Sequence, residues 1–299
     1  MFDRSFPYAE FESPSKLPEP LRHSRVKLSQ GQIFWREVGT GPDVIFLHGS
    51  WRDGSQWLPI VEELASEYHC CVPDRLGCGE SESANIHHSI AVGVENLAEY
   101  VAALKLEKVD LIGHSLGGWI AASYALKYPN KVKGLILLSP EGVNVEGLQR
   151  RWRWLRWLSA NPPIFPFLLK LAHPFLRLLG RGDAIADGFK LREKMLRSPS
   201  SCEFLFRRRT PELKAELLND HLDFLKIPVL ILQGSRDDAI AQSVSQTYNS
   251  LIPKSELHFI NAGGENLPEE LPVIVGQYIR QFLRGQSVST LEIPTVRQL

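Results

Sequence analysis

The segment 113–117, Gly-His-Ser-Leu-Gly, holds the residues best suited to covalent chemistry. It follows a strand-like apolar run that ends near Ile112, and a helical pattern begins near Leu116. Glycines on both sides of Ser115 permit a sharp turn that would lift its hydroxyl above the edge of a sheet. Amide groups at the start of the following helix would then face a developing oxyanion. The pattern predicts acyl transfer with Ser115 as the nucleophile.

Two other segments carry a resemblance to a known family. Residues 48–51 read His-Gly-Ser-Trp after a β-branched run, and residues 74–81 read Asp-Arg-Leu-Gly-Cys-Gly-Glu-Ser. Together with 113–118 they resemble the motifs of the α/β-hydrolase fold superfamily, in its serine-nucleophile branch, and the likeness extends over about 32–283. The resemblance implies that Ser115 is the nucleophile and that the amides of Leu116 and Ser50 form the oxyanion hole. It gives His48 and His114 structural roles beside these loops.

The resemblance also implies a catalytic acid after the next-to-last strand. Residues 234–240 read Gly-Ser-Arg-Asp-Asp-Ala-Ile, and Asp237 stands at the family's acid position. A carboxylate there would orient and stabilise a protonated imidazole. Asp238 is expected to face solvent. The alternative for this segment is a solvated acidic turn.

The catalytic histidine of the family should follow the last strand, in a pattern that resembles Gly-His, then Glu and Pro. Residues 264–272 keep the glycine, Glu270 and Pro272, but Glu265 stands where the histidine belongs. A carboxylate with a reference pKa of about 4.3 is a weak base towards a serine hydroxyl. If Asp237 and Glu265 approach each other, like-charge repulsion should raise the pKa of one of them. The expected triad is therefore atypical or incomplete.

A histidine from elsewhere in the chain is the alternative base. His258 lies on the last predicted strand, and His87 and His88 follow the 74–81 loop. Each also has a structural interpretation: a packed strand residue for His258, and a solvated loop for the other two.

The segments that must position these residues have the sequence pattern of an α/β fold. Short apolar strands alternate with helical segments, which is typical of a mainly parallel sheet covered by helices on both faces. Between Ser139 and Ile227 no strand pattern occurs, so a helical cap is expected at 143–225, inserted after the sixth strand. The expected core is then 25–142 and 226–284, with a Pro-rich leader at 1–24 and a flexible tail at 285–299.

The predicted cap is basic and rich in tryptophan. Between Gly147 and Gly182 there are seven Arg or Lys residues and no Asp or Glu. Cationic and aromatic residues together suit an anionic lipid surface, so peripheral membrane contact through the cap is one hypothesis. Trp154 and Trp157 gather on one side of a helical wheel, but Arg151 falls among them. The alternative is a helical cap that packs over the sheet.

Composition excludes some classes of function. The chain has 299 residues, with 34 Lys or Arg and 34 Asp or Glu, so no basic field exists to hold a nucleic acid. The four cysteines lack metal-ligand spacing and suggest neither a disulfide framework nor a metal site. No export signal is recognisable, so a cytoplasmic location is expected, and the motifs imply no cofactor.

Two functions remain open from the sequence. The first is a serine hydrolase that acts on an ester or related acyl bond of a small apolar substrate. The second is a catalytically degenerate hydrolase fold that binds a ligand or a protein, since a fold alone does not establish a reaction. The loss of the histidine favours the second, whereas Ser115, its glycines and Asp237 favour the first.

Overall fold

The computed structural model describes residues 19–83, 85–160, 163–178 and 182–285. Residues 1–18 of the expected leader and 286–299 of the expected tail lie outside these ranges.

Within the described ranges, eight strands form one sheet in the order β1-β2-β4-β3-β5-β6-β7-β8. The first two pairings, β1 with β2 and β2 with β4, are antiparallel, and the other five are parallel. The strands are β1 (Arg22–Lys27), β2 (Gln32–Val38), β3 (Asp43–Leu47), β4 (His69–Pro73), β5 (Val109–His114), β6 (Val132–Leu138), β7 (Val229–Gly234) and β8 (Ser255–Ile260). The expected mainly parallel α/β fold is confirmed.

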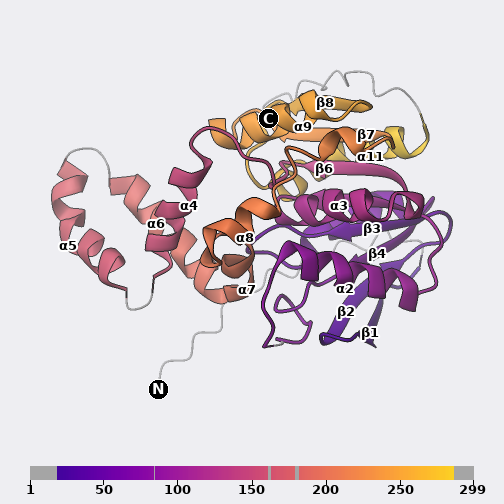
Figure 1. The fold of residues 1–299 in the computed structure, drawn as a ribbon, viewed down its shortest axis with the longest axis horizontal. Coiled ribbons are helices and arrows are strands. Elements are labelled where there is room, and N and C mark those ends of the chain that lie inside the picture. The colour runs from indigo at the N-terminus through magenta and orange to yellow at the C-terminus, as the bar shows by residue number, and fades with distance from the viewer. Residues whose placement is uncertain (1–18, 84, 161–162, 179–181, 286–299) are drawn as a thin grey trace, which may run out of the picture.

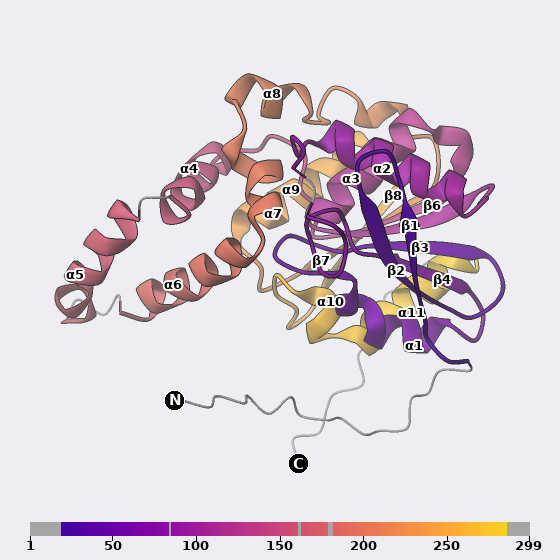
Figure 2. The same ribbon diagram turned by 90° about the horizontal axis from the view of Figure 1, so that it is seen from below.

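Helices cover both faces of this sheet (Figures 1 and 2). The α-helices of the core are α1 (Leu58–Leu64), α2 (Ile90–Ala103), α3 (Leu116–Lys127), α9 (Ala239–Leu251), α10 (Leu267–Glu270) and α11 (Pro272–Leu283). Apolar residues of α2, α3 and α9 belong to one buried cluster, whereas those of α1, α10 and α11 belong to a second cluster on the opposite face. Strands β6 and β7 are buried along nearly their whole length, as their continuous apolar runs require.

The chain leaves the sheet after β6 and returns to it at β7. The intervening helices are α4 (Leu148–Leu158), α5 (Ile164–Leu178), α6 (Gly182–Arg197), α7 (Pro199–Cys202) and α8 (Thr210–Ala215). Shorter turns are 3₁₀ segments at Gly54–Trp57, Pro129–Lys131 and Leu222–Phe224, and a π turn at Glu203–Arg207. Helices α5 and α6 project away from the sheet in both views (Figures 1 and 2).

Strand order places the carboxyl ends of β3 and β5 side by side. β3 has β4 as its neighbour on one side and β5 on the other. The direction in which successive strands are added to the sheet therefore reverses between β3 and β5. Leu47 at the end of β3 pairs in register with Gly113 near the end of β5. In open α/β sheets such a reversal creates the crevice in which ligands bind. The loops that carry Ser50 and Ser115 therefore begin at the same edge.

One strand of the sheet, β1, has no clear strand pattern in the sequence. β1 begins at Arg22, inside the segment expected to be a leader, and it pairs with β2 along its whole length. Four of its six residues are exposed, so it has no apolar run and only a weak strand pattern. The N-terminal boundary of the core at residue 25 was therefore placed too late. All four cysteines are buried and free, with no disulfide among the described residues.

Candidate active site

Ser115 forms a strained turn between β5 and α3. Its φ of 51° and ψ of −117° lie in a region that non-glycine residues rarely occupy. Three backbone hydrogen bonds hold it there: its amide donates to Leu138 at 2.9 Å, and its carbonyl accepts from Trp119 and Glu141, both at 3.2 Å. The side chain remains partly exposed, and Leu116, as the first residue of α3, has an amide with no partner within the helix.

Gly117 allows the first turn of α3 to approach the end of β3. A Cβ atom added to Gly117 would lie 2.3 Å from the carbonyl oxygen of Leu47 and 2.6 Å from that of His48. Both neighbours are backbone atoms, which cannot rotate away. Glycine is therefore required here for close packing.

We expect Gly117→Ala to destabilise the protein by about 3 kcal/mol, since the added methyl group forces backbone to shift. Gly188→Ala in α6 is the matched control, because a Cβ there meets nothing within 4 Å. Removing that helical glycine should stabilise the protein by up to about 1 kcal/mol. Urea unfolding measures both changes, and equal effects would contradict the packing argument.

The loop after β3 carries Ser50 and is held by a buried glutamine. Gln56 accepts a hydrogen bond from the Gly49 amide at 2.9 Å, and its amide group lies 3.2 Å from Nδ1 of His114. The other ring nitrogen of His114 lies 2.9 Å from the carbonyl oxygen of Glu265. Burial lowers the pKa of His114 to about 4, so the ring is neutral near pH 7. With both ring nitrogens engaged, His114 is a link between three loops, which agrees with its expected structural role.

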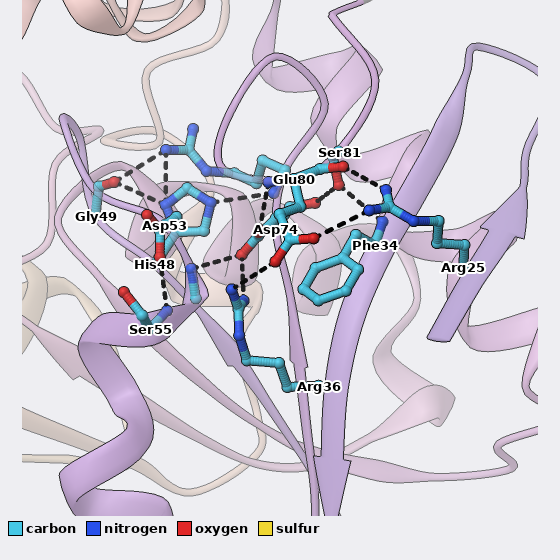
Figure 3. Close-up of polar contacts among 12 residues, drawn as sticks. Arg25, Phe34, Arg36, His48, Gly49, Asp53, Ser55, Asp74, Glu80 and Ser81 are labelled. Atoms are coloured by element: carbon cyan, nitrogen blue, oxygen red, sulfur yellow. Dashed lines mark hydrogen bonds and ion pairs between the residues drawn. The ribbon is translucent and has the colours of Figure 1, made fainter. Parts of the chain in front are cut away.

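A second histidine, His48, also holds the loop that carries Ser50 (Figure 3). Nε2 of His48 accepts from the backbone amide of Arg75 at 3.0 Å, and the Arg75 guanidinium donates to the carbonyl of Gly49 at 3.0 Å. Burial, assisted by the positive charge of Arg75, lowers the pKa of His48 well below its ordinary value. His48 therefore stays neutral and positions the Ser50 loop.

The 74–81 loop is organised around a buried carboxylate, Asp74 (Figure 3). Asp74 accepts from the Gly54 amide at 2.7 Å and from the Glu80 amide at 2.9 Å, and it pairs with Arg36 at 2.9 Å. These bonds join β2, the start of the 54–57 turn and the loop after β4. The motif thus stabilises the loops beside the site.

Ser115, Asp237 and Glu265 line one pocket at the carboxyl edge of the sheet. The loops after β7 and β8 are joined, because the amide of Arg236 donates to the carbonyl of Gly263 at 2.8 Å. The structure therefore brings together the three residues that the sequence analysis selected. The pocket is also lined by three polar residues that the analysis did not select: Ser139, Glu141 and Arg151.

Asp237 is held by two donors. Gln233 donates to one carboxylate oxygen at 2.9 Å, and the amide of Asp238 donates to the other at 2.8 Å. Burial raises the pKa of Asp237, and these two hydrogen bonds lower it in part. Asp238 is exposed as expected, and it caps the start of α9 by accepting from the Ala241 amide at 2.9 Å.

Glu265 lies at the mouth of the pocket on a loop fixed by several contacts. Glu270 accepts from the Gly264 amide at 2.6 Å, which explains the carboxylate that follows in the motif. His114 donates to the backbone of Glu265, and Arg52 joins this region to the β3 loop by an ion pair with Glu269 at 2.7 Å. Although the residue is exposed, protein crowds its carboxyl group, and this desolvation raises the pKa of Glu265.

Arg151 of α4 faces the pocket carboxylates. Its guanidinium lies 2.9 Å from Asp238, and its charge lowers the pKa values of Glu141, Asp237 and Glu265, which burial raises. The sequence signal for this role was the cation that interrupts the aromatic side of the predicted helix. One positive charge therefore offsets part of the repulsion among the pocket carboxylates.

We expect Arg151→Gln to reduce stability by about 2 kcal/mol at pH 8 and by less at pH 5. The folded state binds protons more tightly than the unfolded state at carboxyls whose pKa is raised. Ionising these carboxyls therefore lowers the stability of the folded state as pH rises. Losing Arg151 increases that cost where the carboxyls are ionised. Urea unfolding at the two pH values measures it. Arg153→Gln, exposed on the same helix, is the control, and an equal loss in both variants would refute the role.

The three alternative histidines lie elsewhere. His258 packs against Tyr278 with ring centroids 5.3 Å apart, and His87 is exposed. His88 is buried against Phe204 in a separate cavity on the α2 side of the sheet. None of the three lines the Ser115 pocket.

The sequence model of the α/β-hydrolase fold family matches residues 42–271, most of the chain. The chain belongs to this family. It is 29% identical over 244 residues to 2-hydroxy-6-oxo-2,4-heptadienoate hydrolase of Pseudomonas putida, covering 76% of this chain and 84% of that one. It is 27% identical over 234 residues to the pimeloyl-[acyl-carrier protein] methyl ester esterase of Vibrio vulnificus, covering 75% and 87%.

A solved structure with the same fold is a thermophilic esterase from Thermogutta terrifontis. It superposes with a TM-score of 0.67 at 26% identity, over 88% of this chain and 98% of that one. These relatives support a hydrolase of the α/β-hydrolase fold. In this chain Glu265 follows Gly264 after the last strand, and Ser115 occupies the turn after β5.

Proposed function

We propose that this hydrolase cleaves carboxylic esters that have an apolar acyl group, with Ser115 as nucleophile and Glu265 as base. The observation that carries the proposal is the strained Ser115 turn in one pocket with Asp237 and Glu265. An apolar acyl group is proposed from the apolar composition of the 143–225 cap, since the small cavity that Leu47 and Ile120 line on the α2 side is separate from the Ser115 pocket.

In the proposed reaction, the Ser115 hydroxyl oxygen bonds to the ester carbonyl carbon and its proton passes to Glu265. The amides of Leu116 and Ser50 stabilise the negative charge on the carbonyl oxygen. The bond to the alcohol oxygen then breaks, and the alcohol leaves with the proton. Water attacks the acyl-enzyme in the same way, which releases the acid and restores Ser115.

The charges around Glu265 suit a carboxylate base. Desolvation raises its pKa, which strengthens it as a base, whereas the charge of Arg151 favours its ionised form. The second candidate is a binding protein with a degenerate site. It is favoured by one observation: His114 is the histidine that lines the pocket in the described residues, and its ring nitrogens are already engaged.

Labelling with a fluorophosphonate, followed by peptide mapping, tests the proposal. We expect the probe on Ser115 and turnover of p-nitrophenyl esters from butyrate to decanoate. Labelling without turnover would support the degenerate site, since the nucleophile would react once without a base to complete the cycle. Labelling at another serine would refute the proposal.

A further inference from the structure

The cap exposes large apolar side chains far from the Ser115 pocket. Trp154 and Trp157 on α4 are 45% and 53% exposed, and Phe167 and Leu171 on α5 are 59% and 64% exposed. We call this set the cap tip, which comprises Trp154, Trp157, Ile164, Phe167, Leu168 and Leu171. Large apolar residues gathered in this way mark an interaction site more often than single exposed ones do.

An aromatic contact joins the two helices that carry the cap tip. The ring of Phe165 packs edge-on against Trp154 at 5.2 Å between centroids and against Trp157 at 5.7 Å, which joins the end of α4 to the start of α5. Phe167 of α5 and Phe189 of α6 also line a groove of about 750 Å³ between these two helices. Helix α5 lies at the end of the molecule farthest from the sheet in both views (Figures 1 and 2).

The segment around the cap tip is strongly basic. Residues 148–197 contain eleven Arg or Lys against three Asp or Glu, whereas the whole chain has no net charge. Arg150, Arg153 and Lys170 make no ion pair within the part of the chain that the structure describes. Lys170 and Arg192 also line the groove. Positive charge is thus concentrated beside the exposed apolar surface.

We propose that the cap tip docks on the surface of a bilayer that contains anionic lipids. The basic residues would contact the headgroups, and the tryptophans and α5 side chains would enter the boundary with the acyl chains. A second copy of the chain fits less well, because pairing two cap tips would bring two basic surfaces together. In the described residues, no helix is both long and apolar enough to cross a membrane, so the contact is interfacial.

Helix α4 connects the cap tip to the pocket. Arg151 in its first turn lines the pocket, and the exposed Trp154 and Trp157 follow in its next turns. The docking itself does not depend on the proposed ester hydrolysis.

Sedimentation with vesicles tests the proposal on the full chain. We expect binding to vesicles of equal parts phosphatidylglycerol and phosphatidylcholine, weak binding to phosphatidylcholine alone, and loss of binding as salt rises from about 0.1 M to about 1 M. The fluorescence of Trp154 and Trp157 should shift to shorter wavelength on binding. A Trp154→Phe/Trp157→Phe variant should lose that shift.

The double variant Phe167→Glu/Leu171→Glu should bind the anionic vesicles at least about tenfold more weakly, because it puts two charges into the apolar contact. Phe224→Glu is the matched control, since Phe224 is 66% exposed outside the cap tip. Arg150→Gln/Arg153→Gln/Lys170→Gln tests the charge in the same way.

Four results would overturn the proposal. Three are equal binding by the cap-tip variant and wild type, equal loss in the Phe224 control, and equal binding to both kinds of vesicle. The fourth is self-association that the cap-tip variant abolishes, without vesicle binding by wild type, which would show a second copy as the occupant. Circular dichroism and thermal unfolding of each variant show whether it is folded, which separates lost binding from lost structure.

Discussion

Ser115→Ala should lower kcat/KM for an accepted ester by at least about 10³-fold. Ser115 occupies the strained turn at the start of α3 and lines the pocket together with Asp237 and Glu265. Without that oxygen no acyl-enzyme forms, whereas the neighbouring donors and carboxylates remain. Progress curves with p-nitrophenyl butyrate measure the change.

Ser123→Ala is the control for that experiment. Ser123 lies on the same helix, its hydroxyl is buried without a partner among the described residues, and it does not line the pocket. We expect its activity to stay within about twofold of wild type. A Ser115→Ala enzyme that kept its rate would remove the serine from the mechanism and would leave the pocket carboxylates to act on water directly.

Glu265→His should raise ester hydrolysis at pH 7 to 8 by about 10²-fold. Glu265 shares a pocket with Ser115 and Asp237, so an imidazole at this position would have a nucleophile and an orienting carboxylate nearby. A neutral imidazole accepts the serine proton and returns it to the leaving alcohol near neutral pH, which a carboxylate does less well. Initial rates across a pH series measure the gain.

Five companion variants locate the origin of any gain. Asp237→Asn in the Glu265→His background should remove most of it, because the imidazole would lose its partner. Glu265→Gln in the natural background keeps the shape but removes the base, and we expect it to lower the rate. His258→Ala, His87→Ala and His88→Ala should leave the rate unchanged, since these side chains lie outside the pocket. A histidine variant without activity would show a relocated base.

The pH profiles should also differ in their midpoints. A carboxylate base works in its ionised form, so wild-type activity should rise with pH through the pKa of Glu265, which desolvation raises from its ordinary value. The histidine variant should rise through the pKa of an imidazole, with a reference value of about 6.5. Identical profiles would indicate that residue 265 does not act as the base in either protein.

Local sequence patterns were enough to predict the sheet and the nucleophile turn. β3, β6 and β7 are marked by short apolar runs, because the inner strands of a parallel sheet are buried on both faces. The turn at Ser115 needs glycine at Gly113 and Gly117, where any Cβ would meet backbone within 2.6 Å. The apolar runs and the constraint on Gly113 act within a few residues and can be read from the order of residue types, whereas Gly117 is constrained by the distant residues Leu47 and His48. β1 was not predicted because most residues of this edge strand are exposed and need not be apolar, so no apolar run marks it.

Tertiary structure decided which side chains accompany Ser115. Arg151 reaches the pocket from α4, and Gln56 bridges Gly49 to His114 across 58 residues of sequence. The residues around Arg151 and around Gln56 do not indicate which distant residues these side chains contact, because those contacts depend on how the cap and the loops pack. The same holds for α4, whose Trp152 is buried while Trp154 is exposed. The sequence by itself therefore determined the fold and the nucleophile turn, and it has Glu265 after Gly264, where the family resemblance predicts a histidine. Only packing between distant segments determined the charge balance of the pocket and the side of the cap that faces solvent.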